Sequence, residues 1–168
     1  MSKKKKKSNK TKSVDELVRE GVILLQRGRH KQALEPLQEV LNREPNNFDA
    51  TLNLSAALIL DKKYKVAIPL LEKLIKVDPE NAMIWTNLGA CYLGNPVLAD
   101  DAAQHKAVDA FVHALDIDPA APNVAYNIGL IHKDRNELDV ALKWFQLAAK
   151  TNPQDQDALY WIQKIAKK

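Results

Sequence analysis

The sequence predicts an all-α fold in which antiparallel helix pairs stack into a solenoid. The first observation is a period: four prolines close helix-forming segments and lie 34, 40 and 34 residues apart, namely Pro45, Pro79, Pro119 and Pro153. The second is that the same residue types recur at fixed distances before each proline. A period of this size is typical of stacked repeats, in which each unit buries its apolar face only against its neighbours.

The second helix of each predicted pair carries three recurring positions. An alanine stands twelve residues before the proline, a large apolar residue eight before it, and a further apolar residue five before it. In chain order these are Ala33, Ala67, Ala107 and Ala141; Leu37, Leu71, Phe111 and Phe145; and Val40, Leu74, Ala114 and Ala148. Positions four and three residues apart share one helical face, so we expect this face to be buried.

The first helix of each pair carries a small residue within an otherwise apolar stretch: Gly21, Ser55, Gly89 and Gly129. A small side chain there lets the neighbouring helix approach closely. Between the two helices, Gly28, the segment 61–63 and Asn136 are the expected turns of the first, second and fourth units. Ser13 is the expected N-cap of the first helix. Pro36 and Pro69 fall inside second helices, where we expect kinks.

The third unit matches a known repeat signature in order: Trp85, Leu88, Gly89 and Tyr92, then Ala107, Phe111, Ala114 and Pro119. In these residues the sequence resembles the tetratricopeptide repeat (TPR) family, and the likeness extends over residues 14–153. The resemblance implies a right-handed superhelix whose first helices line a concave surface. It also implies a protein-binding scaffold, although a repeat fold by itself does not fix a function.

The expected organisation is a lysine-rich tail, residues 1–12, followed by one TPR domain, residues 13–168. Its repeats span about 14–47, 48–81, 82–121 and 122–155, and residues 156–168 form an amphipathic capping helix that covers the last apolar face. The third repeat is six residues longer, between its two helices. There we expect a second helix from about Pro96 to Ile117, with Gly94 ending the preceding helix in the left-handed conformation and Asn95 as N-cap; the alternative is a flexible loop.

Charge is divided unevenly between the tail and the repeats. The chain carries +4, but without the seven tail lysines 18 basic residues face 21 acidic ones. These lysines, a candidate anion-binding segment, are Lys3, Lys4, Lys5, Lys6, Lys7, Lys10 and Lys12. The tail is too polar to cover a core, so we expect disorder. No apolar stretch is long enough for a signal peptide or a transmembrane helix, and Cys91 is the only cysteine. We therefore expect a soluble cytoplasmic protein.

The sequence offers little for catalysis, cofactors or metals. The four histidines are scattered over three units, and no glycine-rich phosphate loop or pair of zinc-type cysteines occurs. Asp101 and His105 lie four residues apart on a helix, but two ligands do not make a metal site, and a solvated helix face explains them. Cys91 precedes the signature tyrosine in a packed helix, which favours a buried, inert thiol. We expect no enzyme activity.

The predicted concave surface holds the most informative pattern. The sixth position of the first helices is asparagine in three successive units: Asn53, Asn87 and Asn127. A carboxamide both donates and accepts hydrogen bonds, which matches one peptide unit of a bound chain. The arrangement looks like the asparagine ladder of some superhelical TPR proteins. The alternative is that these asparagines merely hydrate an empty surface.

Apolar side chains should share this surface, and a continuous apolar concave patch normally has a partner. The expected groove residues, besides the asparagines, are Leu52, Ala56, Ala90, Tyr126 and Leu130. Charged substitutions at Leu52 or Tyr126 are expected to leave folding intact, because these side chains should face the groove. The carboxylate-clamp subtype of the family is a poor match, since Val18, Val22 and Met83 stand where it has polar residues.

Three functions remain open at this level. The first is an adaptor or chaperone-like scaffold that holds an extended or helical segment of another protein in the groove. The second is a nucleic-acid or ribosome-associated accessory protein whose affinity comes from the lysine tail. The third is a structural module in which the groove receives another copy of the chain.

Overall fold

The computed structural model describes residues 11–95 and 99–167. These residues form nine α-helices and no strand. In chain order the helices are α1 Val14–Gln26, α2 His30–Arg43, α3 Phe48–Leu60, α4 Tyr64–Val77, α5 Ala82–Leu93, α6 Asp101–Ile117, α7 Val124–Asp134, α8 Leu138–Thr151 and α9 Gln156–Ile165. The prediction of an all-α solenoid is confirmed.

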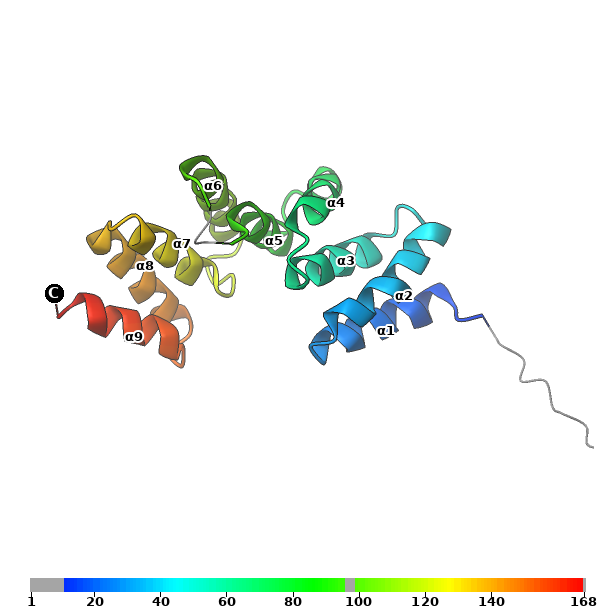
Figure 1. Cartoon of the computed structure of the whole chain (residues 1–168), viewed down its shortest axis with the longest axis horizontal. Helices are drawn as coiled ribbons and strands as arrows, with labels where there is room; N and C mark the ends of the chain where they lie inside the picture. Colours follow the sequence, from blue (N-terminus) through cyan, green and yellow to red (C-terminus); the bar gives the residue numbers. More distant parts are fainter. Residues whose placement is uncertain (1–10, 96–98, 168) are drawn as a thin grey trace, which may run out of the picture.

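The helices are strung out along one long axis, and each packs against the next one in the chain (Figure 1). In that view α4 and α6 lie on the outer side of a shallow arc, and α3, α5 and α7 lie on its inner side. The first helices of successive pairs also touch, α1 with α3 and α3 with α5. The backbones of α5 and α7 approach each other much less than those of α1 and α3 or of α3 and α5. The row of first helices on the inner side is therefore less regular after α5.

The core repeats one contact in three of the four units. A glycine of the first helix faces the large apolar residue of the second, and an added Cβ would come within 2.6 Å of Leu37 at Gly21, 2.6 Å of Phe111 at Gly89 and 2.7 Å of Phe145 at Gly129. The recurring alanine, large apolar and third apolar positions of the second helices are all buried. The small-residue column therefore does what the sequence predicts: it brings the paired helices into direct contact.

The short turns inside three pairs share one backbone conformation. Gly28, Lys62 and Asn136 have φ of 70°, 60° and 61°. In each turn the next residue donates its N–H back to the preceding helix, as Lys63 does to the carbonyl of Leu58 at 2.8 Å. These turns lie where the sequence places them. Both α2 and α4 continue as helices through their prolines, Pro36 and Pro69. The kinks expected there stay a prediction.

The third unit differs from the prediction. The second helix, α6, begins at Asp101 and not near Pro96, and its N-cap is Asp100, whose carboxylate accepts from the N–H of Ala103 at 2.7 Å. It is 17 residues long, against 14 for α2, α4 and α8. Residues 96–98 lie outside the described residues. Gly94 has the expected positive φ of 54°, but its ψ of −115° is not that of a left-handed helix.

Candidate functional site

The three asparagines of the predicted ladder lie on the helices of the inner side, α3, α5 and α7, and all are half-buried. The Nδ2 of Asn53 donates to the backbone carbonyl of Asp49 at 2.8 Å, one turn earlier in its own helix. The side-chain carboxamides of Asn87 and Asn127 make no hydrogen bond with another described residue. Two of the three carboxamides are therefore available to a ligand in full, and that of Asn53 keeps its oxygen as an acceptor.

The ladder is regular only over its first half. Asn53 and Asn87 stand on α3 and α5, which pack directly against each other. Asn127 stands on α7, which reaches the stack mainly through α6 and not through α5. The even spacing of three asparagines that the sequence suggests is thus less regular after Asn87, although Leu93 of α5 and Ile128 of α7 belong to one buried cluster.

The expected apolar wall beside the asparagines is half-buried along its length: Leu52, Ala56, Ala90, Tyr126 and Leu130. Two of these side chains also pack inward. Leu52 packs against the cluster that contains Leu37 and Leu71. The ring of Tyr126 lies 5.7 Å from that of buried Phe145, and burial raises the pKa of its hydroxyl. The premise that these two side chains face only the groove is therefore wrong, and a charged substitution at Leu52 or Tyr126 is expected to destabilise the fold.

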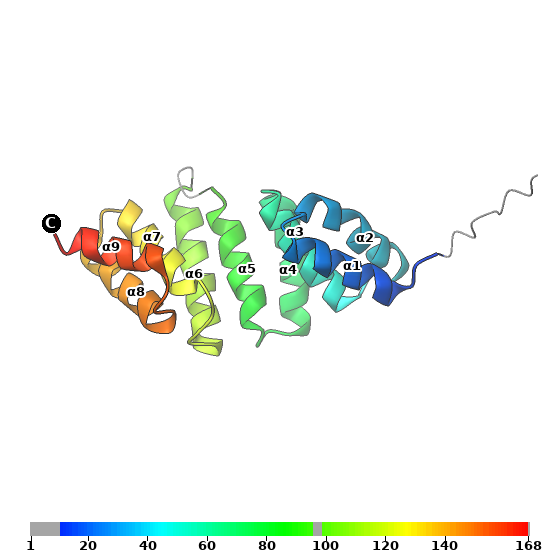
Figure 2. The ribbon, with the colours of Figure 1, turned by 90° about the horizontal axis from the view of Figure 1, so that it is seen from below.

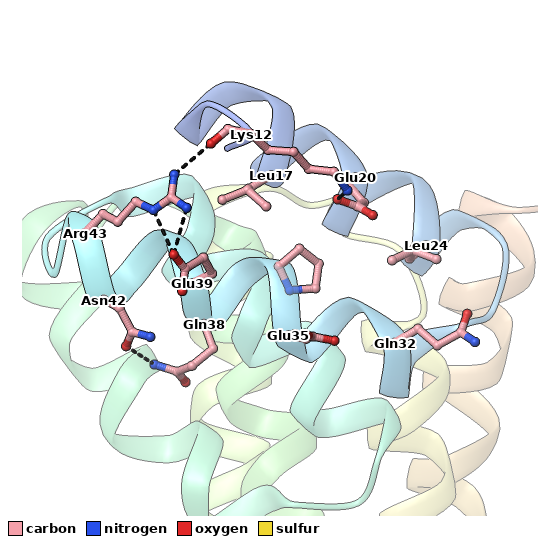
Figure 3. Close-up of a pocket in the computed structure, with 11 residues that line it drawn as sticks. Lys12, Leu17, Glu20, Leu24, Gln32, Glu35, Gln38, Glu39, Asn42 and Arg43 are labelled. Atoms are coloured by element: carbon pink, nitrogen blue, oxygen red, sulfur yellow. Dashed lines mark hydrogen bonds and ion pairs between the residues drawn. The ribbon is translucent and has the colours of Figure 1, made fainter. Parts of the chain in front are cut away.

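A large depression lies elsewhere, on the end of the stack formed by α1 and α2 (Figure 3). It has a volume of about 740 Å³, with Leu17, Leu24 and Pro36 in its wall. Ion pairs line it: Lys12 with Glu20, and Arg43 with Glu39 at 2.7 Å. Arg43 also donates to the backbone carbonyl of Lys12 at 2.7 Å. Polar side chains thus cover the first apolar face, and they attach the end of the tail to it.

The remaining tail lysines, residues 3–10, lie outside the described residues. The anion-binding segment predicted from them stays a prediction. Lys12 is the one tail lysine among the described residues. Its ammonium forms an ion pair with Glu20, and its side chain is half exposed.

The candidate chemical groups have structural roles where they are described. Cys91 is buried, and desolvation raises the pKa of its thiol to about 12, so it is a poor nucleophile. The Nδ1 of His105 lies 2.6 Å from the backbone carbonyl of Asp101, one helical turn away, and not from its carboxylate. Across residues 11–95 and 99–167, no group of three or more histidine, cysteine or acidic side chains is arranged to hold a metal.

Comparison with known proteins fits this architecture. The family model described as Tetratricopeptide repeat matches residues 18–73, 61–105 and 101–156. The chain belongs to the tetratricopeptide repeat family. Repeats of this family are generally non-enzymatic and act in protein–protein interaction. Membership therefore supports a scaffold role of this general kind. This agrees with the resemblance that the third unit shows in sequence.

Relatives and solved structures give the family context. The BBSome complex member BBS4 of Bos taurus is 23% identical over 146 residues, which cover 87% of this chain and 27% of that protein. The general transcriptional corepressor ssn6 of Schizosaccharomyces pombe is 27% identical over 124 residues, or 73% of this chain and 11% of the relative. The chain thus spans about a quarter or less of these relatives. A structure of MamA from Desulfovibrio magneticus RS-1 superposes with a TM-score of 0.71 at 25% identity, covering 86% of this chain and 78% of that one.

Among the described residues, no helix combines the length and the apolar character that crossing a membrane requires.

Proposed function

We propose that the protein is a non-enzymatic adaptor or chaperone-like scaffold that holds a peptide or helical segment of another protein against the inner surface of α3, α5 and α7. One observation carries this proposal: the carboxamides of Asn87 and Asn127 are unengaged next to half-buried apolar side chains. Polar groups that can both donate and accept, beside an apolar wall, suit a peptide backbone with its side chains.

The spacing expected of two packed helices such as α3 and α5 would suit an extended ligand. Packed helices lie about 8–10 Å apart and an extended chain advances about 3.3 Å per residue, so neighbouring asparagines would meet about every third residue. Asn53 and Asn87 would hold the backbone in this way, whatever its side chains. Asn127 would contact a more distant part of the same segment, since α7 lies beyond the longer third unit.

We also propose that the protein is cytoplasmic. Cys91 is the one cysteine of the sequence, so no disulfide can form within it, which fits a reducing compartment.

The test uses a synthetic library of capped decapeptides, with each position randomised in turn, and the full-length protein. We expect wild-type protein to retain a defined subset of peptides. The variant Asn53→Ala, Asn87→Ala, Asn127→Ala should bind them more weakly, by about 1–3 kcal/mol, because the partner's peptide groups lose their hydrogen bonds. The amide control is Gln146→Ala on the exposed side of α8, which should bind normally.

Two results would contradict the proposal: retention of no peptide by the wild-type protein, or equal binding by the triple variant with a helical circular dichroism spectrum. The tail hypothesis is tested with the same peptides. A chain that begins at Thr11 should bind them as the full chain does, whereas loss of binding would favour the lysine tail as the source of affinity.

A further inference from the structure

A separate hollow of about 440 Å³ lies where α5 begins, the helix that carries Asn87. On one side it is bounded by the α4–α5 connection and the first turns of α5, and on the other by the end of α6 and the α6–α7 connection. Both connections lie at the same edge of the solenoid (Figure 2). The lining residues are Asp78, Glu80, Asn81, Ala82, Met83, Thr86, Ile117, Asp118, Ala121 and Pro122.

The wall of this hollow is apolar and leaves a long side chain uncovered. Met83 is 60% exposed, although it belongs to a helix that is otherwise buried or half-buried along its length. Ile117 is half-buried and Ala121 is buried opposite it. An apolar wall of this kind gains free energy when a ligand displaces its water.

The charge of the hollow has one sign. Three carboxylates line it, those of Asp78, Glu80 and Asp118, and its lining contains no lysine, arginine or histidine. Asp78 accepts from the side chain of Asn81 at 3.0 Å, and one oxygen of Asp118 accepts from the N–H of Ala120 at 2.9 Å. Glu80 is exposed and makes no hydrogen bond or ion pair with another described residue. An apolar concavity with uncompensated negative charge attracts cations.

We propose that this hollow is a subsite for one lysine or arginine side chain of the bound segment. The proposal rests on the proposed function and names the chemistry of its partner. A lysine or arginine can lay its methylene stem along Met83 and Ile117 while its charged head stays near the three carboxylates and in water. An acidic side chain would meet like charge, and a short apolar one would fill only part of the wall.

The position of the hollow links it to the asparagines. Met83 precedes Asn87 by one helical turn of α5, and side chains four residues apart are neighbours on a helix, with Cβ atoms about 5–6 Å apart. A ligand whose backbone is held at Asn87 therefore directs a nearby side chain toward Met83. The subsite would set the register of the segment, which backbone contacts alone leave undefined.

The decapeptide library tests this directly. Wild-type protein should select lysine or arginine at one position. A selected peptide should bind about tenfold more tightly than its copy with norleucine at that position, because three carboxylates attract the same cation. The preference should shrink as salt is raised. The variant Glu80→Lys should abolish it, whereas Glu35→Lys, at an exposed, unpaired glutamate of α2, should not.

The outcomes separate the two proposals. If peptides bind without any basic preference, or if the preference survives both Glu80→Lys and Met83→Lys, the subsite is overturned while the scaffold function stands. If no peptide binds, both are overturned. If a synthetic peptide of residues 1–12 binds at this site more tightly than every library member, the occupant is the tail of a second copy and not a partner protein. The comparison of lysine with norleucine needs only wild-type protein, so a misfolded variant does not remove the test.

Discussion

At the scale of single residues, the three short turns show how the same geometry is made from different amino acids. Gly28, Lys62 and Asn136 occupy equivalent places, with φ between 60° and 70°. Glycine adopts this conformation freely and asparagine readily, whereas for other residues it costs about 1–2 kcal/mol. Lys62 is thus the strained member, and its side chain makes no hydrogen bond or ion pair with a described residue that would offset the strain.

We predict that Lys62→Gly stabilises the protein by about 0.5–1 kcal/mol. Relief of the left-handed strain is worth about 1–2 kcal/mol, and the greater freedom of glycine in the unfolded chain takes back about 0.4–1 kcal/mol. Urea unfolding followed by circular dichroism measures the difference. The matched control is Gly28→Ala, which should destabilise the protein: no atom lies within 4 Å of the added Cβ, so only the backbone conformation opposes it. A lower stability of Lys62→Gly than of wild type would contradict the prediction.

Residue-level prediction from the sequence succeeded where a residue type has one strong preference. Gly28 and Asn136 are predictable turn residues, and the position of Cys91 predicts its burial. Lys62 gives no such signal, because the tertiary packing of the two helices imposes the turn and not the residue itself. The packing of Tyr126 was missed for a related reason. Helical periodicity gives the direction of a side chain, but it does not show that Phe145 from the next helix reaches the ring.

At the scale of helices, the ends are decided by caps. Ser13 forms a capping box with Glu16: its hydroxyl accepts from the N–H of Glu16 at 3.2 Å, and its own N–H donates to the carboxylate at 2.7 Å. The sequence predicted this cap correctly. It misplaced the start of α6, because Asn95 and Asp100 are both acceptable N-caps and residue type alone does not choose between them.

The capping box predicts a pH dependence. Hydrogen bonds from the Ser13 backbone and then its side chain lower the pKa of Glu16 from its ordinary value of 4.5. A carboxylate with a depressed pKa contributes stability that is complete above its unfolded value and is lost as pH falls through its folded value. Wild type should therefore be more stable than Glu16→Gln at pH 7, with the gap closing progressively below pH 4.5. Urea midpoints across pH 2–7 measure it, and an undiminished gap at the acidic end would disprove the linkage.

At the scale of the whole molecule, the two ends of the solenoid are closed by different means. At the first end, two ion pairs lie over the apolar face, Lys12 with Glu20 and Arg43 with Glu39 (Figure 3). At the other end α9 covers the last pair: Ala158 is fully buried, and the Trp161 ring stacks on that of Phe145 with centroids 6.1 Å apart and planes inclined by 16°. The repeat pattern predicted this order of helices. The weak backbone contact between α5 and α7 was not predictable, because helical periodicity does not give the distance between successive units.

The different ends lead to the last prediction, on how stability is distributed along the stack. Ending the chain after Gln154 removes α9 and exposes Phe145 and Ala148 to water, so we expect a loss of several kcal/mol, as each unit is stabilised only by its neighbours. For the same reason the loss should be local: amide hydrogen exchange should accelerate most in α7 and α8 and least in α1 and α2.

Removal of residues 1–10, which leaves the Lys12 ion pair in place, is the control and should leave unfolding unchanged. A chain without α9 that unfolds at the same urea concentration as the full chain would show that α9 does not cap the stack, and equal acceleration in all helices would show that the stack unfolds as one cooperative unit.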